Sequence, residues 1–178
     1  ESYEGLPFHQ LSLELAPRVI GPAALEDDEE MLLLYTSGTT GVPKGVPLRA
    51  AQIAANLDAL AEIWEWTPED TVLHNLPLFH VHGLVLGLFG TLRRGGSFYW
   101  LPRFSPESVA ETLAKTKGMY FGVPTLYHRL ATAAESSPKV AAGLAAARLL
   151  VSGSAALPRR EHNRIEALCG RGVLERYG

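Results

Sequence analysis

The sequence predicts an α/β protein with a mostly parallel sheet flanked by helices. Short apolar runs alternate with longer amphipathic segments along the 178 residues, and this repetition is typical of a parallel sheet with right-handed crossovers. The composition, with 47% hydrophobic and 20% charged residues and no low-complexity tract, is ordinary for a globular protein. A chain of this length buries about 70% of the surface that its unfolded form exposes, which is enough for a sizeable core.

Charge and hydropathy exclude several classes of function. The formal net charge is −3, with acidic and basic residues interspersed, so the chain has no general field that attracts nucleic acid or an anionic membrane. No apolar run approaches the roughly 20 residues of a membrane span. A single cysteine, Cys169, cannot form an internal disulfide, which suits a reducing compartment. We therefore expect a cytoplasmic location and small-molecule partners, and the sequence does not indicate an oligomeric state.

The first predicted elements follow an acidic stretch. Residues 1–30 contain prolines and the run LEDDEE, and we expect them to form a connector that arrives from an upstream part of the protein. The apolar run MLLLY (31–35) predicts a strand that is buried on both faces. Residues 49–64 predict an amphipathic helix, because apolar side chains recur at helical spacing at Ile53, Leu57, Leu60 and Trp64.

The middle of the chain continues the alternation. TVLHNL (71–76) is strand-like, and the largely apolar segment 81–92 suits a buried helix that the glycines of RRGG (93–96) close. SFYWL (97–101) predicts the next strand.

A well-marked helix is predicted at 105–116. Ser105 is its N-cap candidate, Pro106 takes the first helical position and Glu107 lies in the first turn. The remaining strands are predicted at 118–123, 147–153 and 172–178, and the remaining helices at 124–134 and 158–170.

Ligands of such sheets bind where loops leave the carboxyl ends of the strands. Three glycine-bearing loops are predicted at such ends, at 36–45, 122–124 and 152–156. The sequence therefore places its candidate binding residues where chemistry is expected.

The loop 36–45 (TSGTTGVPKG) combines glycines, hydroxyl side chains and one lysine behind a strand. Its backbone N–H groups and hydroxyls can surround phosphate oxygens while Lys44 neutralises charge, and a flexible surface turn is the alternative. A Walker A loop is excluded, because Pro43 replaces the glycine before the lysine and Gly45 replaces the metal-binding Ser/Thr. The predicted phosphate-binding residues are Thr36, Ser37, Gly38, Thr39, Thr40, Gly41 and Lys44.

The segment YTSGTTGVPKGV (35–46) resembles the phosphate-binding signature of the adenylate-forming superfamily, which includes acyl-CoA synthetases, luciferases and adenylation domains. Further motifs follow in the expected order: LPLFHVHGL (76–84), GVPTLYHRL (122–130), SGSAALP (152–158) and ERYG (175–178). The resemblance covers residues 31–178 and is most similar to the malonyl-CoA synthetase subfamily. It implies that 31–178 are part of a large N-terminal nucleotide- and acyl-binding α/β domain, with the C-terminal domain absent.

Two histidines, His80 and His82, stand two residues apart and would share one side of an extended stretch. A metal site would want a third ligand, which no His or Cys cluster supplies, and two ordinary histidines are a further alternative. The resemblance implies instead that His80 lines the junction of acyl and nucleotide pockets, as a catalytic residue beside Lys44, and that Val81 lies near the acyl group. Amino-acid-activating relatives usually carry an Asp here, and the segment 75–84 has none, which argues against an amino-acid substrate.

Arg129 stands near the end of the motif 122–130. If Pro124 opens the helix, Thr125 and Arg129 share a face, and the planar guanidinium matches a carboxylate. The resemblance implies that Arg129 grips the distal carboxylate of a dicarboxylic acid, and a solvated helix charge is the alternative.

Small residues in SGSAALP leave room for a flat base, although tight packing at a turn is an alternative explanation. The resemblance implies an adenine site formed by Ser154, Ala155, Ala156, Glu175, Arg176 and Tyr177, with Tyr177 stacking on the base. It also implies that Gly178 borders the acyl pocket.

The reaction implied by the resemblance has two halves. A carboxylate attacks the α-phosphate of ATP, and the thiol of coenzyme A then displaces AMP from the acyl-adenylate. The Mg²⁺ ligand and the adenylation lysine are expected beyond Gly178, so this chain should contain no metal site and be inactive alone. The acid is expected to be malonate. A medium-chain or aryl monocarboxylic acid, or a non-catalytic nucleotide-binding module, is the alternative.

Overall fold

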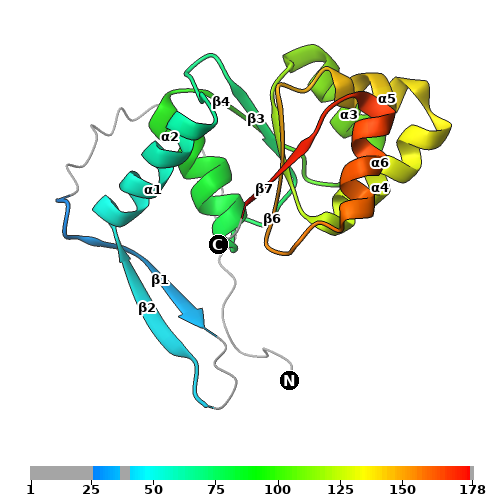
Figure 1. Ribbon diagram of the computed structural model, residues 1–178. Coiled ribbons are helices and arrows are strands. Elements are labelled where there is room, and N and C mark those ends of the chain that lie inside the picture. Colours follow the sequence, from blue (N-terminus) through cyan, green and yellow to red (C-terminus); the bar gives the residue numbers. More distant parts are fainter. Residues whose placement is uncertain (1–25, 37–40, 177–178) are drawn as a thin grey trace. The chain divides into compact units, whose positions relative to one another are not determined.

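The computed structural model describes residues 26–36 and 41–176. The chain divides into two compact units, residues 1–50 and residues 51–178. The first contains a two-stranded hairpin and the second contains the main sheet with its helices (Figure 1).

In the first unit, β1 (Glu30–Thr36) pairs antiparallel with β2 (Lys44–Arg49). The prediction of a strand at 31–35 is confirmed, but its assignment to a buried position in the parallel sheet is wrong. Leu33 is 53% exposed, and β1 pairs with the segment that follows it rather than with a parallel neighbour. The loop 36–45 therefore joins two antiparallel strands, because an apolar run alone does not identify its partner.

The second unit confirms the predicted α/β class with a parallel sheet. Its five strands have the order β4-β3-β5-β6-β7, and every neighbouring pair is parallel. The strands are β3 (Thr71–His74), β4 (Ser97–Trp100), β5 (Met119–Gly122), β6 (Leu149–Gly153) and β7 (Val173–Arg176).

The predicted helices form, with two local differences. They are α1 (Ala50–Ile63), the π-helix η1 (His82–Gly90), α2 (Thr91–Arg94), α3 (Pro106–Thr116), α4 (Pro124–Ser136), α5 (Pro138–Ala145) and α6 (Arg159–Cys169). The first difference is that the segment 81–92, predicted as a buried helix, is a π-helix over most of its length. The second is that α5 was not predicted from the sequence. Ser105 caps α3 as expected, because its Oγ accepts a hydrogen bond from Ser108 N at 3.2 Å.

Helices cover both faces of the sheet, with α3 to α6 on one side and α1 and α2 on the other (Figure 1). Successive residues of a strand point to opposite faces. On β5, Tyr120 belongs to the core beneath α3 to α6. Phe121 points to the other face, where its ring centroid lies 5.5 Å from that of Trp64 and 5.8 Å from that of Trp66.

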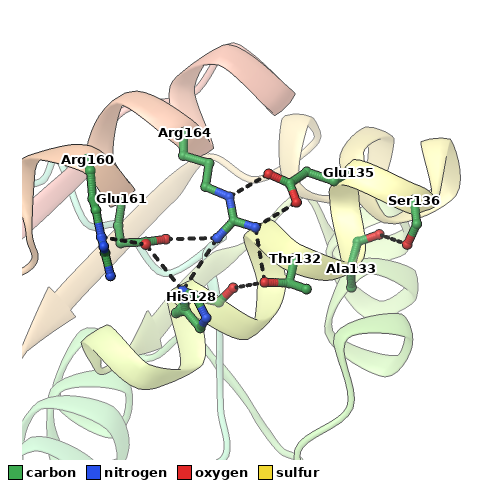
Figure 2. A network of polar contacts seen from close by, with 8 residues as sticks. All are labelled: His128, Thr132, Ala133, Glu135, Ser136, Arg160, Glu161 and Arg164. Carbon is green, nitrogen blue, oxygen red and sulfur yellow. Dashed lines mark hydrogen bonds and ion pairs between the residues drawn. The ribbon is translucent and has the colours of Figure 1, made fainter.

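A polar network fastens α4 to α6 (Figure 2). Arg164 of α6 binds both carboxylate oxygens of Glu135, at 2.6 and 2.7 Å, and also Glu161 Oε2 at 3.3 Å. Glu161 is only 4% exposed, and its second oxygen lies 3.2 Å from His128 Nδ1. Burial alone would raise the pKa of Glu161. The hydrogen bonds with His128 and Arg164 together lower this pKa by more than burial raises it, so the net shift is downward.

Candidate functional site

A pocket of about 510 Å³ lies at the carboxyl edge of the parallel sheet, where ligands of such sheets bind. Residues that follow β3 and β5 or end β6 and β7 line it. Its apolar walls are Leu76, Pro77, Val81 and Val123, and its polar side chains are His80, His82, Ser154 and Arg176. Two of the three predicted glycine-bearing loops, 122–124 and 152–156, therefore contribute to the pocket.

The pocket brings together residues predicted for two different ligand groups. His80 and Val81 were predicted to border the acyl group, and Ser154 and Arg176 to border adenine. His80 is exposed, with its ring centroid 4.6 Å from that of Phe79. The walls of one cavity are thus shared by the two predicted sites.

His82 is the buried histidine of the pair, and no role was predicted for it beyond the alternatives for the pair. The two histidines do not share one side, because the chain turns into η1 between them instead of staying extended. His82 is 7% exposed, and its Nδ1 lies 3.4 Å from Ser154 Oγ. Burial, with a contribution from Arg176, lowers the pKa of His82 to about 4, so its ring is neutral at pH 7.

A sequence signal for this contact exists in the neighbouring glycine. A Cβ at Gly153 would lie 2.8 Å from Cε1 of His82, so glycine is required for the ring to approach the end of β6. The next residue, Ser154, has a φ of 69°, which lies in the left-handed region that residues other than glycine rarely adopt.

A second buried histidine, His74, lies at the end of β3. It is fully buried, and its Nδ1 accepts a hydrogen bond from Leu76 N at 3.0 Å, which fixes the start of the loop that carries the pocket wall. Burial, and then the charge of His82, lower the pKa of His74 to about 4.

Glu175 and Arg176 are adjacent on β7 and point to opposite faces. Glu175 Oε1 accepts a hydrogen bond from Leu157 N at 2.7 Å, and Oε2 lies 3.2 Å from His162 Nε2; these contacts lower the pKa of Glu175. Its carboxylate therefore holds the 154–157 loop, in which Ala155 and Ala156 are exposed. Arg176 lines the pocket and donates to Asn56 Oδ1 at 3.0 Å.

Arg129 lies outside this pocket. It is exposed on α4, and its guanidinium carbon is 4.4 Å from the ring centroid of Phe104. That distance corresponds to a cation–π contact. Its role in gripping a carboxylate stays a prediction.

The predicted phosphate-binding residues belong to the first unit. Thr36 ends β1 and Lys44 begins β2, and Thr36 Oγ1 donates to Lys44 O at 3.5 Å. Gly41 is exposed, with open space where a Cβ would stand. The predictions for Ser37, Gly38, Thr39, Thr40, Tyr177 and Gly178 fall outside the described residues.

Residues 26–36 and 41–176 contain no group of three or more His, Cys, Asp or Glu side chains that could hold a metal ion. Within the same ranges, no helix combines the length and apolar character needed to cross a membrane.

A family model described as AMP-binding enzyme matches residues 4–178. The chain is 40% identical over 167 residues to a protein named malonate–CoA ligase from Arabidopsis thaliana, and 38% identical over 159 residues to the mitochondrial malonate–CoA ligase of Homo sapiens. These alignments cover 85% and 83% of this chain, and the chain spans only 28% of the length of each relative.

A solved structure is similar over most of the chain. It is a malonyl-CoA ligase ternary product complex with methylmalonyl-CoA and AMP, 54% identical, with a TM-score of 0.85 over 89% of this chain and 35% of that one.

Proposed function

Because the chain belongs to the AMP-binding enzyme family, we propose that it forms part of an ATP-dependent acid–CoA ligase. The proposed acid is a small dicarboxylic acid, with malonate as the first candidate. The names of the two curated relatives and of the similar product complex support this substrate. The observation that carries the proposal is the single pocket shared by residues predicted for the acyl group and for adenine.

The proposed reaction has two steps. A carboxylate oxygen of the acid attacks the α-phosphorus of ATP, and the bond to pyrophosphate breaks. The sulfur of coenzyme A then attacks the acyl carbon, and AMP leaves. Both steps depend on positioning and on neutralising charge, which preorganised donors provide.

Each group of predicted residues keeps its proposed role. The hydroxyls and amides of Thr36, Ser37, Gly38, Thr39, Thr40 and Gly41 would hold the β- and γ-phosphates, with the ammonium of Lys44. The adenine site would comprise Ser154, Ala155, Ala156, Glu175, Arg176 and Tyr177. The acyl site would comprise His80, Val81, Arg129 and Gly178.

Mg²⁺ is part of the proposal, as a charge that neutralises the phosphates. The described residues supply no cluster for it. We also propose a cytoplasmic location, for which the single cysteine is the supporting observation; cell fractionation of the tagged complete protein tests it against the mitochondrial location in the human relative's name.

A monocarboxylic acid is the second candidate for the substrate. The apolar walls formed by Leu76, Pro77, Val81 and Val123, and the position of Arg129 outside the pocket, favour it. A non-catalytic nucleotide-binding module is a third possibility, and it predicts no pyrophosphate release with any acid.

Pyrophosphate release by the complete protein separates these candidates. The acids to compare are malonate, methylmalonate, acetate, octanoate and benzoate, each with ATP, Mg²⁺ and coenzyme A. Highest kcat/KM with malonate or methylmalonate is the expected result. Preference for octanoate or benzoate would replace the proposed substrate with a monocarboxylic acid.

A further inference from the structure

The loop of residues 154–157, which follows β6, is held at its two ends. At its start, Ser154 Oγ lies 3.4 Å from Nδ1 of His82. At its end, the backbone N–H of Leu157 donates to Oε1 of Glu175 at 2.7 Å. The first contact comes from η1 and the second from β7, so two separate elements hold this loop.

The middle of the loop has no such support. Ala155 and Ala156 are exposed, and within residues 26–36 and 41–176 no hydrogen bond reaches the backbone of either alanine. A backbone without internal hydrogen bonds keeps one conformation only where its ends are fixed, because ordering each residue costs conformational entropy. The contacts at the two ends therefore determine the shape of the loop.

The carboxylate of Glu175 acts on this loop and does not line the pocket. Glu175 points to the face of β7 opposite Arg176, which does line it. Each carboxylate oxygen of Glu175 has a partner, since Oε1 accepts from Leu157 N and Oε2 lies 3.2 Å from Nε2 of His162. These two contacts lower the pKa of Glu175, so the side chain is ionised at pH 7.

His162 is the donor that holds the second oxygen. An ionised carboxylate can only accept hydrogen bonds, so the hydrogen of this contact is on Nε2 of His162. The imidazole comes from α6, and its side chain is 27% exposed. A glutamate side chain has several staggered rotamers, and a partner on each oxygen restricts Glu175 to the one that reaches Leu157. His162 thereby fixes the carboxylate to which the loop is attached.

The position of α6 itself does not depend on His162. Ile165 of the same helix is fully buried in the core, and Arg164 binds both carboxylate oxygens of Glu135 on α4 (Figure 2). These contacts hold the helix in place. The contact of His162 with Glu175 therefore bears on the neighbouring loop rather than on the packing of the helix.

We propose that His162 is a positioning residue for nucleotide binding, which acts through Glu175 on the loop 154–157. This inference rests on the proposed function, in which this loop borders adenine. It changes the role of the Glu175 side chain from a direct contact with the base to support of the loop that meets the base. The apolar walls of the pocket come from other segments of the chain, so binding of the acid should not depend on this contact.

The test uses the complete protein with the variants His162→Ala and His162→Gln. Asn163→Ala is the matched control, because Asn163 is the exposed neighbour on the same helix. Calorimetry measures the Kd for AMP, steady-state pyrophosphate release measures kcat and the KM values for ATP and malonate, and urea unfolding measures the stability of each variant. Glu175→Ala, alone and combined with His162→Ala, completes a double-mutant cycle that shows whether the histidine acts through the carboxylate.

In His162→Ala we expect the Kd for AMP and the KM for ATP to rise by about 2- to 10-fold, which corresponds to the loss of one hydrogen bond of ordinary net strength. The KM for malonate and kcat should be unchanged. His162→Gln should retain most of the affinity, because the glutamine amide still offers an N–H donor. Asn163→Ala should match the wild type, and the double variant should lose no more affinity than Glu175→Ala alone.

Equal rises in the KM for ATP and for malonate, or an unchanged Kd for AMP in His162→Ala, would overturn the assignment. Additive losses in the double variant would do the same, because the two side chains would then act independently. If the wild-type protein binds AMP but releases no pyrophosphate with any acid, the proposed ligase function fails, while the Kd for AMP still decides the role of His162.

Discussion

Nδ1 of His82 lies 3.4 Å from Oγ of Ser154, although 72 positions separate the two residues in the sequence. The contact joins the start of η1 to the end of β6, and these two segments form adjacent walls of the pocket. Ser154 has a left-handed φ, and a strained backbone conformation of this kind persists only when the surrounding structure supports it. The contact with His82 is part of that support. The shape of the pocket therefore depends on a buried, neutral histidine.

Stability should fall as the pH drops from about 6.5 to 4. The pKa values of His74 and His82 are lowered to about 4 in the folded protein, against about 6.5 when unfolded, so the unfolded chain binds more protons in this window. The contribution of each histidine to stability is complete above the pKa of the unfolded state and is lost as the pH falls to the pKa of the folded state. The loss in free energy of unfolding is at most roughly 3 kcal/mol per histidine. Urea unfolding at several pH values measures it.

His82→Gln should reduce this pH dependence between pH 6.5 and 4.5. The matched control is His80→Gln, since His80 is exposed and should leave the slope unchanged. An unchanged slope in His82→Gln would contradict a folded-state ring that resists protonation.

Gly87→Ala should destabilise the protein by about 1–3 kcal/mol, the usual cost of overpacking a core. A Cβ at this position of η1 would overlap the ring of His74, which is fully buried. Gly172→Ala is the control, because a Cβ there meets nothing within 4 Å. The free energy of unfolding measures both, and equal values would show that η1 can shift away from β3.

Arg164→Met should cost about 1–3 kcal/mol, because the buried carboxylate of Glu161 loses a charged donor and keeps only His128 and Arg160. Lys115→Met removes an ion pair with Glu111 on the exposed surface of α3, and should change stability little. A loss in Arg164→Met no larger than in this control would mean that the network in Figure 2 does not fasten α4 to α6.

Lys44→Ala should lower kcat/KM for the acid by about 10²–10³-fold, the usual effect of removing one preorganised donor from a developing negative charge. Pyrophosphate release by the complete protein measures it, with Lys115→Ala as the control for loss of a surface lysine. Full activity in Lys44→Ala would remove the hairpin from the proposed phosphate site.

The parallel sheet could be predicted from the sequence because its information is local. Strands β4, β5 and β6 lie in short, largely apolar runs, and the helices carry their own signals, such as the Ser105 cap of α3. The β1–β2 hairpin could not be predicted in the same way. MLLLY has the composition of a buried strand of a parallel sheet. Only its pairing with β2 shows that it is instead one strand of an antiparallel hairpin.

The sequence named His80, Val81, Ser154 and Arg176 as candidate site residues, but it did not predict that they line one pocket. His82 and Arg176 are far apart in the sequence, and their approach depends on β7 lying beside β6 and on η1 packing over the same face. Their separate motifs carry no information about that order. The sequence also did not predict that His80 is exposed while His82 is buried, because this difference depends on the turn of the chain into η1.

The alternation of β7 has one more consequence. Glu175 and Arg176 are consecutive, so the removal of one residue between Arg171 and Leu174 would exchange the directions of an acid and a base. The wall of the pocket would then carry a carboxylate in place of a guanidinium. The sign of the charge in this part of the pocket wall is thus set by the phase of one short strand.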